Sequence, residues 1–551
     1  MFNASTNEKD FNRKQMNKSH KENTVKTARI FVLVGLAVLM GALAFAPATA
    51  QDNMTEFVFA HGGPIRNMDA HSHWYGSTHW LTNLLYDCLI WRAADGDGYV
   101  PQAAQSWENV DDTTWRFHLR EGATFHNGEA LDAEAVKWNI DRVREPIGDI
   151  PLYKQWEFVK DTIVVDDLTL DITTEEPYPY FEYDVSYNGC EILPPDYFNE
   201  VGQEEFTRNP VGSGPYMLTE FSESDRYVFD AWDDYHSGRP EIDRVVYQVI
   251  PEPSAQVAAL LAGQVDMIPA VPVPDRPNLE ATEGISLLTE TANRMHHLYA
   301  RVETETGAVA ETYPDFSPAT MDVNVRKAIT HALDRQLLAE VQGAASPRLV
   351  RVCSYYPEGF ADQYTDADVI ADWYNPDMAR EYLAAAGYGE GEGPTVYLDA
   401  PTFQMGGEKE VAEIAAAMLT EVGFNVELSI LDSSAYGTQI SRGGNNRDLM
   451  LVTLGCGPSL LPLFYQCGWV QANYNVCIDE WDAVAQEILR TVDSEARLGL
   501  WQQWWDFYLD YTQTITLYEI TNVMALNTAE FSFTPRKDGW MTFRDLSVAD
   551  M

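Results

Sequence analysis

The sequence predicts an α/β fold, and three observations support that prediction. The chain has 551 residues, of which 45% are hydrophobic, so it can bury a large core and form two or three domains. Residues 114–143 carry the signals of a strand, a turn and a helix in that order. Residues 410–428 carry the reverse order of helix, turn and strand, and this alternation is the usual pattern of an α/β domain.

The unit at 114–143 is predicted from the spacing of its apolar residues. Positions 114–120 alternate between apolar and polar, which indicates a strand with one face on a core and one in water. Asn127-Gly128 supplies the two positive-φ positions that a tight hairpin prefers, so a second strand end is expected near Phe125. Asp132 is expected to cap a helix whose apolar residues repeat at helical spacing as far as Val143.

The remaining elements are predicted from the same signals taken along the chain, and no internal repeat or low-complexity tract interrupts them. Strands are expected at 55–60, on both sides of a turn within 163–172, at 244–250 and at 514–518, and helices at 78–90, 255–261, 325–333, 481–489 and 496–509.

The charge balance is strongly acidic. The chain has 37 Lys and Arg residues against 84 Asp and Glu residues, a formal net charge of -47. Such a charge repels nucleic acids and anionic lipid surfaces, so we expect neither as a partner. It favours a solvated acidic surface suited to salt water; a surface tuned to cationic ligands remains the alternative.

The first fifty residues predict export. Residues 1–29 are polar and basic, residues 30–45 are apolar and uncharged, and Ala48-Thr49-Ala50 suits signal peptidase. We expect a cleaved signal peptide at 1–50 and a mature chain that starts near Gln51. The apolar run is shorter than the ~20 residues of a spanning helix, and an uncleaved anchor is the alternative. No cysteine follows the small residues, which argues against a lipid anchor.

Six cysteines lie after this segment, and their even number favours an oxidising compartment with disulfides. Cys456, Cys467 and Cys477 are close enough in sequence for one loop-closing bridge, but the pairing cannot be read from the sequence. These three residues lack the short CxxC spacing of structural zinc sites, so we expect no zinc there. The other three cysteines are Cys88, Cys190 and Cys353.

One short motif raises the alternative of a metal-dependent hydrolase. In Asp69-Ala70-His71-Ser72-His73, two imidazoles alternate after an expected strand, as they do at the opening of some hydrolase sites. The motif is weak because a lone HxH pattern has many false positives, and an ordinary polar loop is the preferred interpretation. No nucleophile elbow, zinc-protease helix or phosphate-binding loop accompanies it, so we expect a protein without catalytic residues and without a cofactor.

The segment 99–144 can be compared with known families residue by residue. It contains Val100-Pro101, Ser106-Trp107-Glu108, Phe117-His118-Leu119-Arg120, Phe125-His126, Gly128 and the helix start at 133–136, and later landmarks follow in order at 209–216, 234–240, 263–266, 321–335 and 375–388. This pattern resembles the family 5 extracellular solute-binding proteins, the peptide-, opine- and nickel-binding receptors of ABC importers. The resemblance extends from Phe57 to Glu519, nearly the whole mature chain.

The resemblance implies an architecture. It is the two-lobed α/β periplasmic-binding-protein fold of type II, with an extra subdomain in the first lobe and two crossing hinge strands. The implied lobe I consists of residues 51–298 and 516–551, with its insertion at about 72–207, and lobe II consists of residues 299–515. The crossings are expected near 298–302 and 516–520.

The resemblance also implies a function. The two lobes would close over a peptide-like or other small organic solute, and the closed shape would be recognised by ABC permease subunits in the inner membrane. We therefore expect a periplasmic, monomeric, non-catalytic receptor. A second interpretation keeps the fold but assigns it to a chelated metal such as nickel, with His61 or His297 as a ligand.

The resemblance is weakest at the expected ligand site. Peptide-binding members carry a Trp and then an Asp after one lobe II strand, and the Asp pairs with the peptide's α-amino group. Here Leu454 and Gly457 stand at those positions, which argues against a free α-amino peptide. The remaining candidates for ligand contact are mostly aromatic: Tyr436, Arg442, Cys456, Trp469 and Tyr474 in lobe II, and His61, Trp74 and Tyr187 in lobe I.

Overall fold

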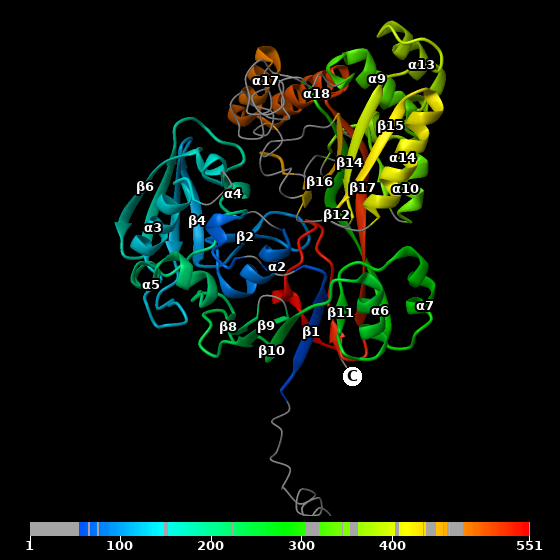
Figure 1. Cartoon of the computed structure of the whole chain (residues 1–551). Helices are drawn as coiled ribbons and strands as arrows, with labels where there is room; N and C mark the ends of the chain where they lie inside the picture. Colours follow the sequence, from blue (N-terminus) through cyan, green and yellow to red (C-terminus); the bar gives the residue numbers. More distant parts are fainter. Residues whose placement is uncertain are drawn as a thin grey trace, which may run out of the picture. The chain divides into compact units, whose positions relative to one another are not determined.

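The structure is a computed structural model of the chain (Figure 1). It describes residues 54–63, 65, 67–73, 76–147, 152–222, 225–302, 319–343, 345–352, 362–402, 407–432, 435–436, 448–455, 457–459, 462 and 478–549. Residues Thr55–Met551 form one compact unit. Strands and helices alternate along it, so the predicted α/β class is confirmed. None of the described helices has the length and apolar character that crossing a membrane requires.

An eleven-stranded mixed sheet forms the centre of the unit. Its strands, in spatial order, are β15 (Asn425–Leu431), β14 (Thr395–Pro401), β16 (Leu449–Gly455), β12 (Ile285–Ala300), β17 (Thr514–Asn527), β11 (Met267–Ile268), β1 (Glu56–His61), β10 (Arg244–Val249), β9 (Arg226–Ala231) and β8 (Tyr216–Phe221), while β13 (Ser346–Pro347) pairs with β17. The predicted strands at 55–60, 244–250 and 514–518 are therefore confirmed, and the last continues to Asn527.

Strands β12 and β17 are long neighbouring strands in the middle of this sheet. They run antiparallel side by side, as Figure 1 shows. The first half of β12 pairs with the end of β17, and that end of β17 also pairs with β11. The second half of β12 pairs with the start of β17 on one side and with β16 on the other. The register shifts between Thr291 and Met295, midway along the pair. The lobe boundaries stay a prediction, and we keep the names lobe I and lobe II for the ranges given above.

The predicted strand–turn–helix unit is present. Strand β5 (Thr114–Leu119) is central in a four-stranded sheet with β4 (Ala104–Asp111), β7 (Thr169–Thr174) and β6 (Val159–Asp166). Helix α3 (Ala133–Val143) follows, and the Asp132 carboxylate caps it by accepting from the Ala135 amide at 2.9 Å. Near Phe125 the expected second strand is reduced to a single bridge between Thr124 and Ala130.

Helix α2 (Gly76–Leu85) ends five residues earlier than the expected 78–90. Its last carbonyl, that of Leu85, accepts from the Gly214 amide at 2.8 Å, which belongs to a distant turn. A Cβ atom at Gly212 would lie 1.8 Å from the same oxygen, so only glycine allows this approach. The chain then enters β2 (Ile90–Arg92), which pairs with β3 (Tyr99–Pro101).

The other helices agree with the expected positions to within a few residues. Of those predicted, α6 (Pro253–Leu261), α9 (Val323–Ala332), α14 (Glu408–Val422), α17 (Asp479–Arg490) and α18 (Ser494–Tyr511) are present. Helix α13 (Pro376–Ala385) lies in the landmark 375–388, where Gly387 suits a helix stop. Further helices, which the sequence did not predict, are α4 (Phe181–Asp184), α5 (Pro195–Arg208), α7 (Arg276–Glu280), α10 (Arg335–Val341), α11 (Asp362–Thr365) and α12 (Ala367–Trp373). A small hairpin of β18 (Phe531–Ser532) and β19 (Ser547–Val548) was also not predicted.

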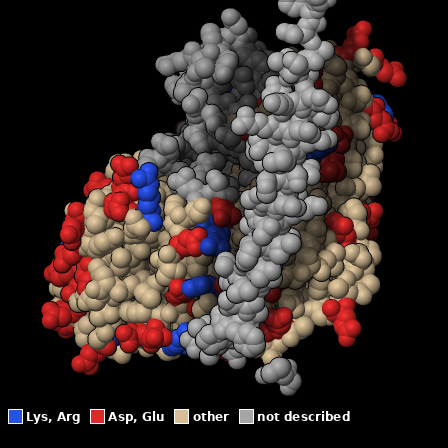
Figure 2. Space-filling model, turned by 60° about the horizontal axis from the view of Figure 1, so that its bottom comes forward, with Lys and Arg blue, Asp and Glu red and all other residues tan. Residues whose placement is uncertain are grey.

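Among the charged side chains of the described surface in Figure 2, acidic ones prevail over basic ones. Because the chain carries a net charge of -47, its folded form suffers self-repulsion that salt screens. We expect the melting temperature, followed by circular dichroism, to rise steadily between 0.01 and 1 M NaCl, as the screening length falls from about 30 Å to about 3 Å. A melting temperature that falls with added salt would contradict an important role for this repulsion.

Candidate functional site

The point where β12 changes register gathers several charged groups. Asn293 has a positive φ of 46° there, and its side-chain amide donates to the Lys537 carbonyl at 3.1 Å. The next residue, Arg294, pairs with Gly455 at the end of β16. The register change therefore joins β12 to β16 and to the C-terminal segment at one junction.

Glu290 lies just before the register change and is 5% exposed. Its Oε2 atom has no hydrogen-bond partner among the described residues. Burial raises the pKa of this carboxyl to about 7; the nearby Arg294 opposes the shift and Asp538 adds to it. The junction thus contains a buried acid whose hydrogen-bonding capacity is only partly used.

Arg294 lies just after the register change and is half-buried. Burial lowers the pKa of its guanidinium, while Tyr187 and Glu290 oppose that shift. Two side chains of opposite charge type therefore flank the register change of a single strand. In this environment of low dielectric, each would interact strongly with a complementary charge.

Tyr187, one of the predicted ligand contacts, lies at the same junction. A Cβ atom at Gly455 would be 3.9 Å from its hydroxyl oxygen, so this lobe I side chain reaches the end of a lobe II strand. Its ring meets the Trp540 ring edge-on, with 5.4 Å between centroids. The Arg92 guanidinium lies 5.2 Å from the Tyr187 centroid and 4.9 Å from that of Trp540, which fixes both rings by cation–π contact.

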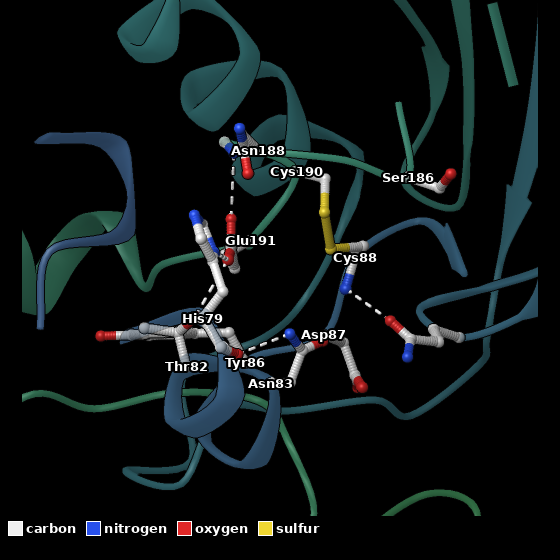
Figure 3. Close-up of a disulfide and its surroundings, with 12 residues drawn as sticks. His79, Thr82, Asn83, Tyr86, Asp87, Cys88, Ser186, Asn188, Cys190 and Glu191 are labelled. Atoms are coloured by element: carbon white, nitrogen blue, oxygen red, sulfur yellow. Dashed lines mark hydrogen bonds and ion pairs between the residues drawn. A yellow bond between two sulfur atoms is a disulfide. The ribbon is translucent and has the colours of Figure 1, made fainter. Parts of the chain in front are cut away.

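A disulfide between Cys88 and Cys190 anchors the segment that carries Tyr187 (Figure 3). The two Cα atoms are 5.0 Å apart, although 102 positions separate the residues in sequence. The Cys190 amide donates to the Tyr187 carbonyl at 3.0 Å, so the bridge and the tyrosine are directly coupled. The possible bridge among Cys456, Cys467 and Cys477 lies outside the described residues.

His61 and Tyr436, two further predicted ligand contacts, have partners within their own lobes. The His61 ring packs edge-on against Trp80 and hydrogen-bonds to the Tyr247 hydroxyl, and burial lowers its pKa to about 4. The Tyr436 hydroxyl donates to the Leu451 carbonyl, and its ring is buried in a small apolar cluster on β16. The predicted contacts Trp74, Arg442, Cys456, Trp469 and Tyr474 lie outside the described residues.

The Asp69–His73 motif is part of the buried polar core of lobe I. His71 Nε2 lies 2.8 Å from the Glu191 carbonyl, and the His73 and His79 rings are 5.5 Å apart. Burial lowers the pKa of both His71 and His73 to about 4. Within the described ranges, no three His, Cys, Asp or Glu side chains are grouped so that they could hold a metal ion. His297, the other histidine considered as a metal ligand, is buried with Nδ1 at 3.1 Å from the Thr516 hydroxyl.

The sequence did not point to Glu290, Arg294, Arg92 and Trp540, which the structure places at the junction with Tyr187. For Glu290 and Arg294 the sequence held one weak signal. Both are charged residues within the long strand ISLLTETANRMHHLYA, and the buried positions of a central strand are ordinarily apolar. Arg92 and Trp540 carried no local signal, since their contact with Tyr187 joins positions that are far apart in the sequence.

Comparison with known proteins gives a family and a set of structural neighbours. The family model described as "Bacterial extracellular solute-binding proteins, family 5 Middle" matches residues 98–466. Among curated proteins, the glutathione-binding protein GsiB of Pectobacterium atrosepticum is 24% identical over 408 residues, which cover 71% of this chain and 74% of that protein. The GsiB protein of Salmonella typhimurium is 22% identical over 415 residues, or 71% and 75% of the two chains.

Solved structures share the fold at low sequence identity. A dipeptide-binding protein from Pseudoalteromonas sp. SM9913 in complex with Met-Leu has a TM-score of 0.78 and 18% identity, and the match covers 90% of this chain and all of that one. The binding protein AgaA in complex with agropinic acid, from A. tumefacien R10, has a TM-score of 0.76 and 21% identity over 90% and 99% of the two chains. NikZ from Campylobacter jejuni with Ni(L-His) has a TM-score of 0.76 and 17% identity over 89% and 99%.

Proposed function

The chain belongs to the bacterial extracellular solute-binding proteins of family 5, and from this premise we propose that it captures a peptide-like solute between its two lobes for an ABC importer. The predicted family and the predicted two-lobed fold of type II periplasmic binding proteins are both confirmed. As a member of this family, the chain is a substrate-binding transport receptor. The proposal concerns its solute, its partner and its route of export.

The junction on β12 carries the proposal for the solute. Arg294 and Glu290 flank the register change, and Tyr187 reaches the same place from lobe I. A solute with a carboxylate could pair with the Arg294 guanidinium, and a cationic or hydrogen-bond-donating group of the same solute could pair with Glu290. Peptides and opines carry such pairs of groups. The Met-Leu and agropinic acid complexes of the structural neighbours are consistent with this class of compound.

Gly457 supports a different placement of the solute from that in peptide-binding members. It stands where those members have the acid for the α-amino group, and a glycine offers no charge. Glu290 supplies an acid at another position, on the crossing strand instead of after β16. We therefore propose that the cationic end of the solute lies near β12. In the peptide-binding members of the family, the acid that pairs with the amino group instead follows the lobe II strand.

The proposal extends to the partner and the location. Delivery to permease subunits of an ABC importer in the inner membrane follows from the family, and we propose a monomeric, non-catalytic receptor. The sequence supports export by a signal peptide at 1–50 that is removed before Gln51, followed by residence in the periplasm. N-terminal sequencing of exported protein should begin near Gln51; a start at Met1 would contradict cleavage.

The solute is tested by thermal shift and calorimetry with a defined panel. The panel consists of glutathione, Met-Leu, Met-Leu with an acetylated amino group, Met-Leu with an amidated carboxylate, and Ni(L-His). We expect at least one peptide with both charges to raise the melting temperature by mass action, and capping either charge to reduce that rise. Binding of Ni(L-His) alone would instead support the chelated-metal receptor, and stoichiometric zinc or iron in purified protein would support the hydrolase.

Variants at the junction make the test specific. Arg294→Gln is expected to weaken binding of the best carboxylate-bearing solute by about 10- to 100-fold, which corresponds to the loss of one charged hydrogen bond. Glu283→Gln serves as the control, because Glu283 is exposed and precedes the same strand. Equal affinity of Arg294→Gln and the control would remove Arg294 from the site.

A further inference from the structure

A set of contacts away from the β12 junction joins lobe I to lobe II. On the lobe I side they involve the segment 176–187, which contains helix α4. On the lobe II side they involve residues 457–459 and the helices α17 and α18 (Figure 1). We propose that these contacts form a latch that holds the two lobes together without a bound solute, and that a proton on Asp184 strengthens the latch. The inference adds a control of lobe closure to the proposed receptor.

Asp184 is the centre of the latch. Its Oδ1 atom accepts from the Ser459 hydroxyl at 2.6 Å, and its Oδ2 atom accepts from the Tyr178 hydroxyl at 2.5 Å. Ser459 belongs to lobe II and is fully buried, and Asp184 is buried as well. One lobe thus places a carboxyl group, and the other a hydroxyl group, inside a shared buried contact. Separating the lobes would return both groups to water.

Tyr180 supplies the apolar part of the latch. Its ring is buried in the aromatic cluster formed by α17 and α18, and its hydroxyl accepts from Trp501 Nε1 at 3.1 Å. The Arg497 guanidinium lies 5.4 Å from the centroid of the same ring. At the rim, Arg490 and Glu176 form an ion pair at 2.8 Å, but both side chains are about half exposed, so this pair contributes little.

The proton dependence follows from the surroundings of Asp184. Burial raises the pKa of its carboxyl from 3.8 to about 7, although the hydroxyls of Ser459 and Tyr178 oppose the shift. The other ionisable groups of its own segment are Glu176, which pairs with Arg490, Glu182, which accepts from Trp107 at 2.7 Å, and four tyrosines. The helices α17 and α18 contribute Arg490 and Arg497, and arginines do not titrate in the neutral range.

A proton on Asp184 favours the closed state, because burial in that state raises the pKa of the carboxyl. On opening, the carboxyl regains water and its ordinary pKa of 3.8, whereas in the closed state its pKa is about 7. Closing therefore takes up a proton, and the closed state loses stability as the pH rises from about 4 to about 7 and little more above that. Between pH 5.5 and 8.5 the ratio of closed to open molecules is expected to fall about 30-fold.

Small-angle X-ray scattering of the protein alone tests the latch. Wild type at constant ionic strength is expected to be compact at pH 5.5 and more open at pH 8.5, whereas Asp184→Asn, which mimics the protonated acid, should stay compact at both. Asp161→Asn is the control, because Asp161 is an exposed carboxylate of the same lobe, and it should behave as wild type. Hydrogen exchange of residues 178–187 provides a second readout if opening is rare, and protection in wild type should then fall about 30-fold over the same range.

Several outcomes would overturn the inference. Wild type that is open at both pH values would show that the contacts do not hold the lobes together without a solute. Equal pH dependence in wild type and Asp184→Asn, or no pH dependence in either readout, would remove Asp184 from the control of closure. Because no solute is present in these measurements, a failure of the peptide-like assignment would leave their result unchanged, and the two proposals can fail separately.

Discussion

Replacing Arg142 with methionine is expected to lower the free energy of unfolding by about 3–5 kcal/mol. Two nitrogens of Arg142 donate to Asp69 at 3.0 and 2.7 Å, and the Asp69 side chain is fully buried. Loss of the guanidinium leaves a carboxylate without its counter-charge in the core of lobe I. Urea unfolding followed by circular dichroism measures the difference.

A matched control lies on the same helix. Lys137 and Asp141 form an ion pair on α3 with the same 2.7 Å separation, but their side chains are 36% and 46% exposed. Lys137→Met is therefore expected to cost no more than about 1 kcal/mol. Equal effects of the two substitutions would contradict the role that we assign to burial. The comparison also bears on the Asp69–His73 motif, because it tests whether Asp69 acts as a structural anchor.

Removing the Cys88–Cys190 disulfide by substituting alanine at both positions is expected to cost about 2–5 kcal/mol. The bridge closes a loop of 102 positions, and a long closed loop restricts the unfolded chain strongly. Both cysteines also belong to one buried apolar cluster, so some packing is lost as well. The difference is measured by urea unfolding under non-reducing conditions.

The disulfide substitution should have a local effect on the junction. The bridge fixes the chain next to Tyr187, so exchange protection of residues 186–191 is expected to fall more than that of the distant helix α14. Dithiothreitol should reproduce the loss of stability in wild type and add little to the double variant. If wild type and the double variant unfold at the same urea concentration, the bridge has no stabilising role in solution.

Locally encoded elements could be predicted well. Strand β5 and helix α3 follow from alternating and helical spacing, and Asp132 caps the helix as expected because the cap needs only residues three positions apart. Helix α14 and strand β15 were predicted for the same reason. Helix α2 was predicted too long, since its end is set by Gly214 from a turn over a hundred residues away.

The predicted ligand contacts stay a prediction, and the structure brings one of those that it describes to the junction. Tyr187 lies at the junction, but His61 and Tyr436 have partners inside their own lobes, and five of the predicted contacts lie outside the described residues. Glu290 and Arg294 were missed because a strand of mixed composition does not show which side chains are buried. The C-terminal segment also reaches this part of β12 only in the folded chain, where the Lys537 carbonyl accepts from Asn293 and Asp538 lies near Glu290.

The sequence by itself determined the α/β class, the family and most of the helices and strands, because these depend on spacing and short motifs that lie within a few turns of chain. The tertiary structure decided that Cys88 pairs with Cys190, where β12 changes register and which of the described side chains meet between the predicted lobes. Asp184 and Ser459 illustrate the reason: 275 positions separate them, and only packing brings a carboxyl and a hydroxyl into one buried contact where burial can change a pKa.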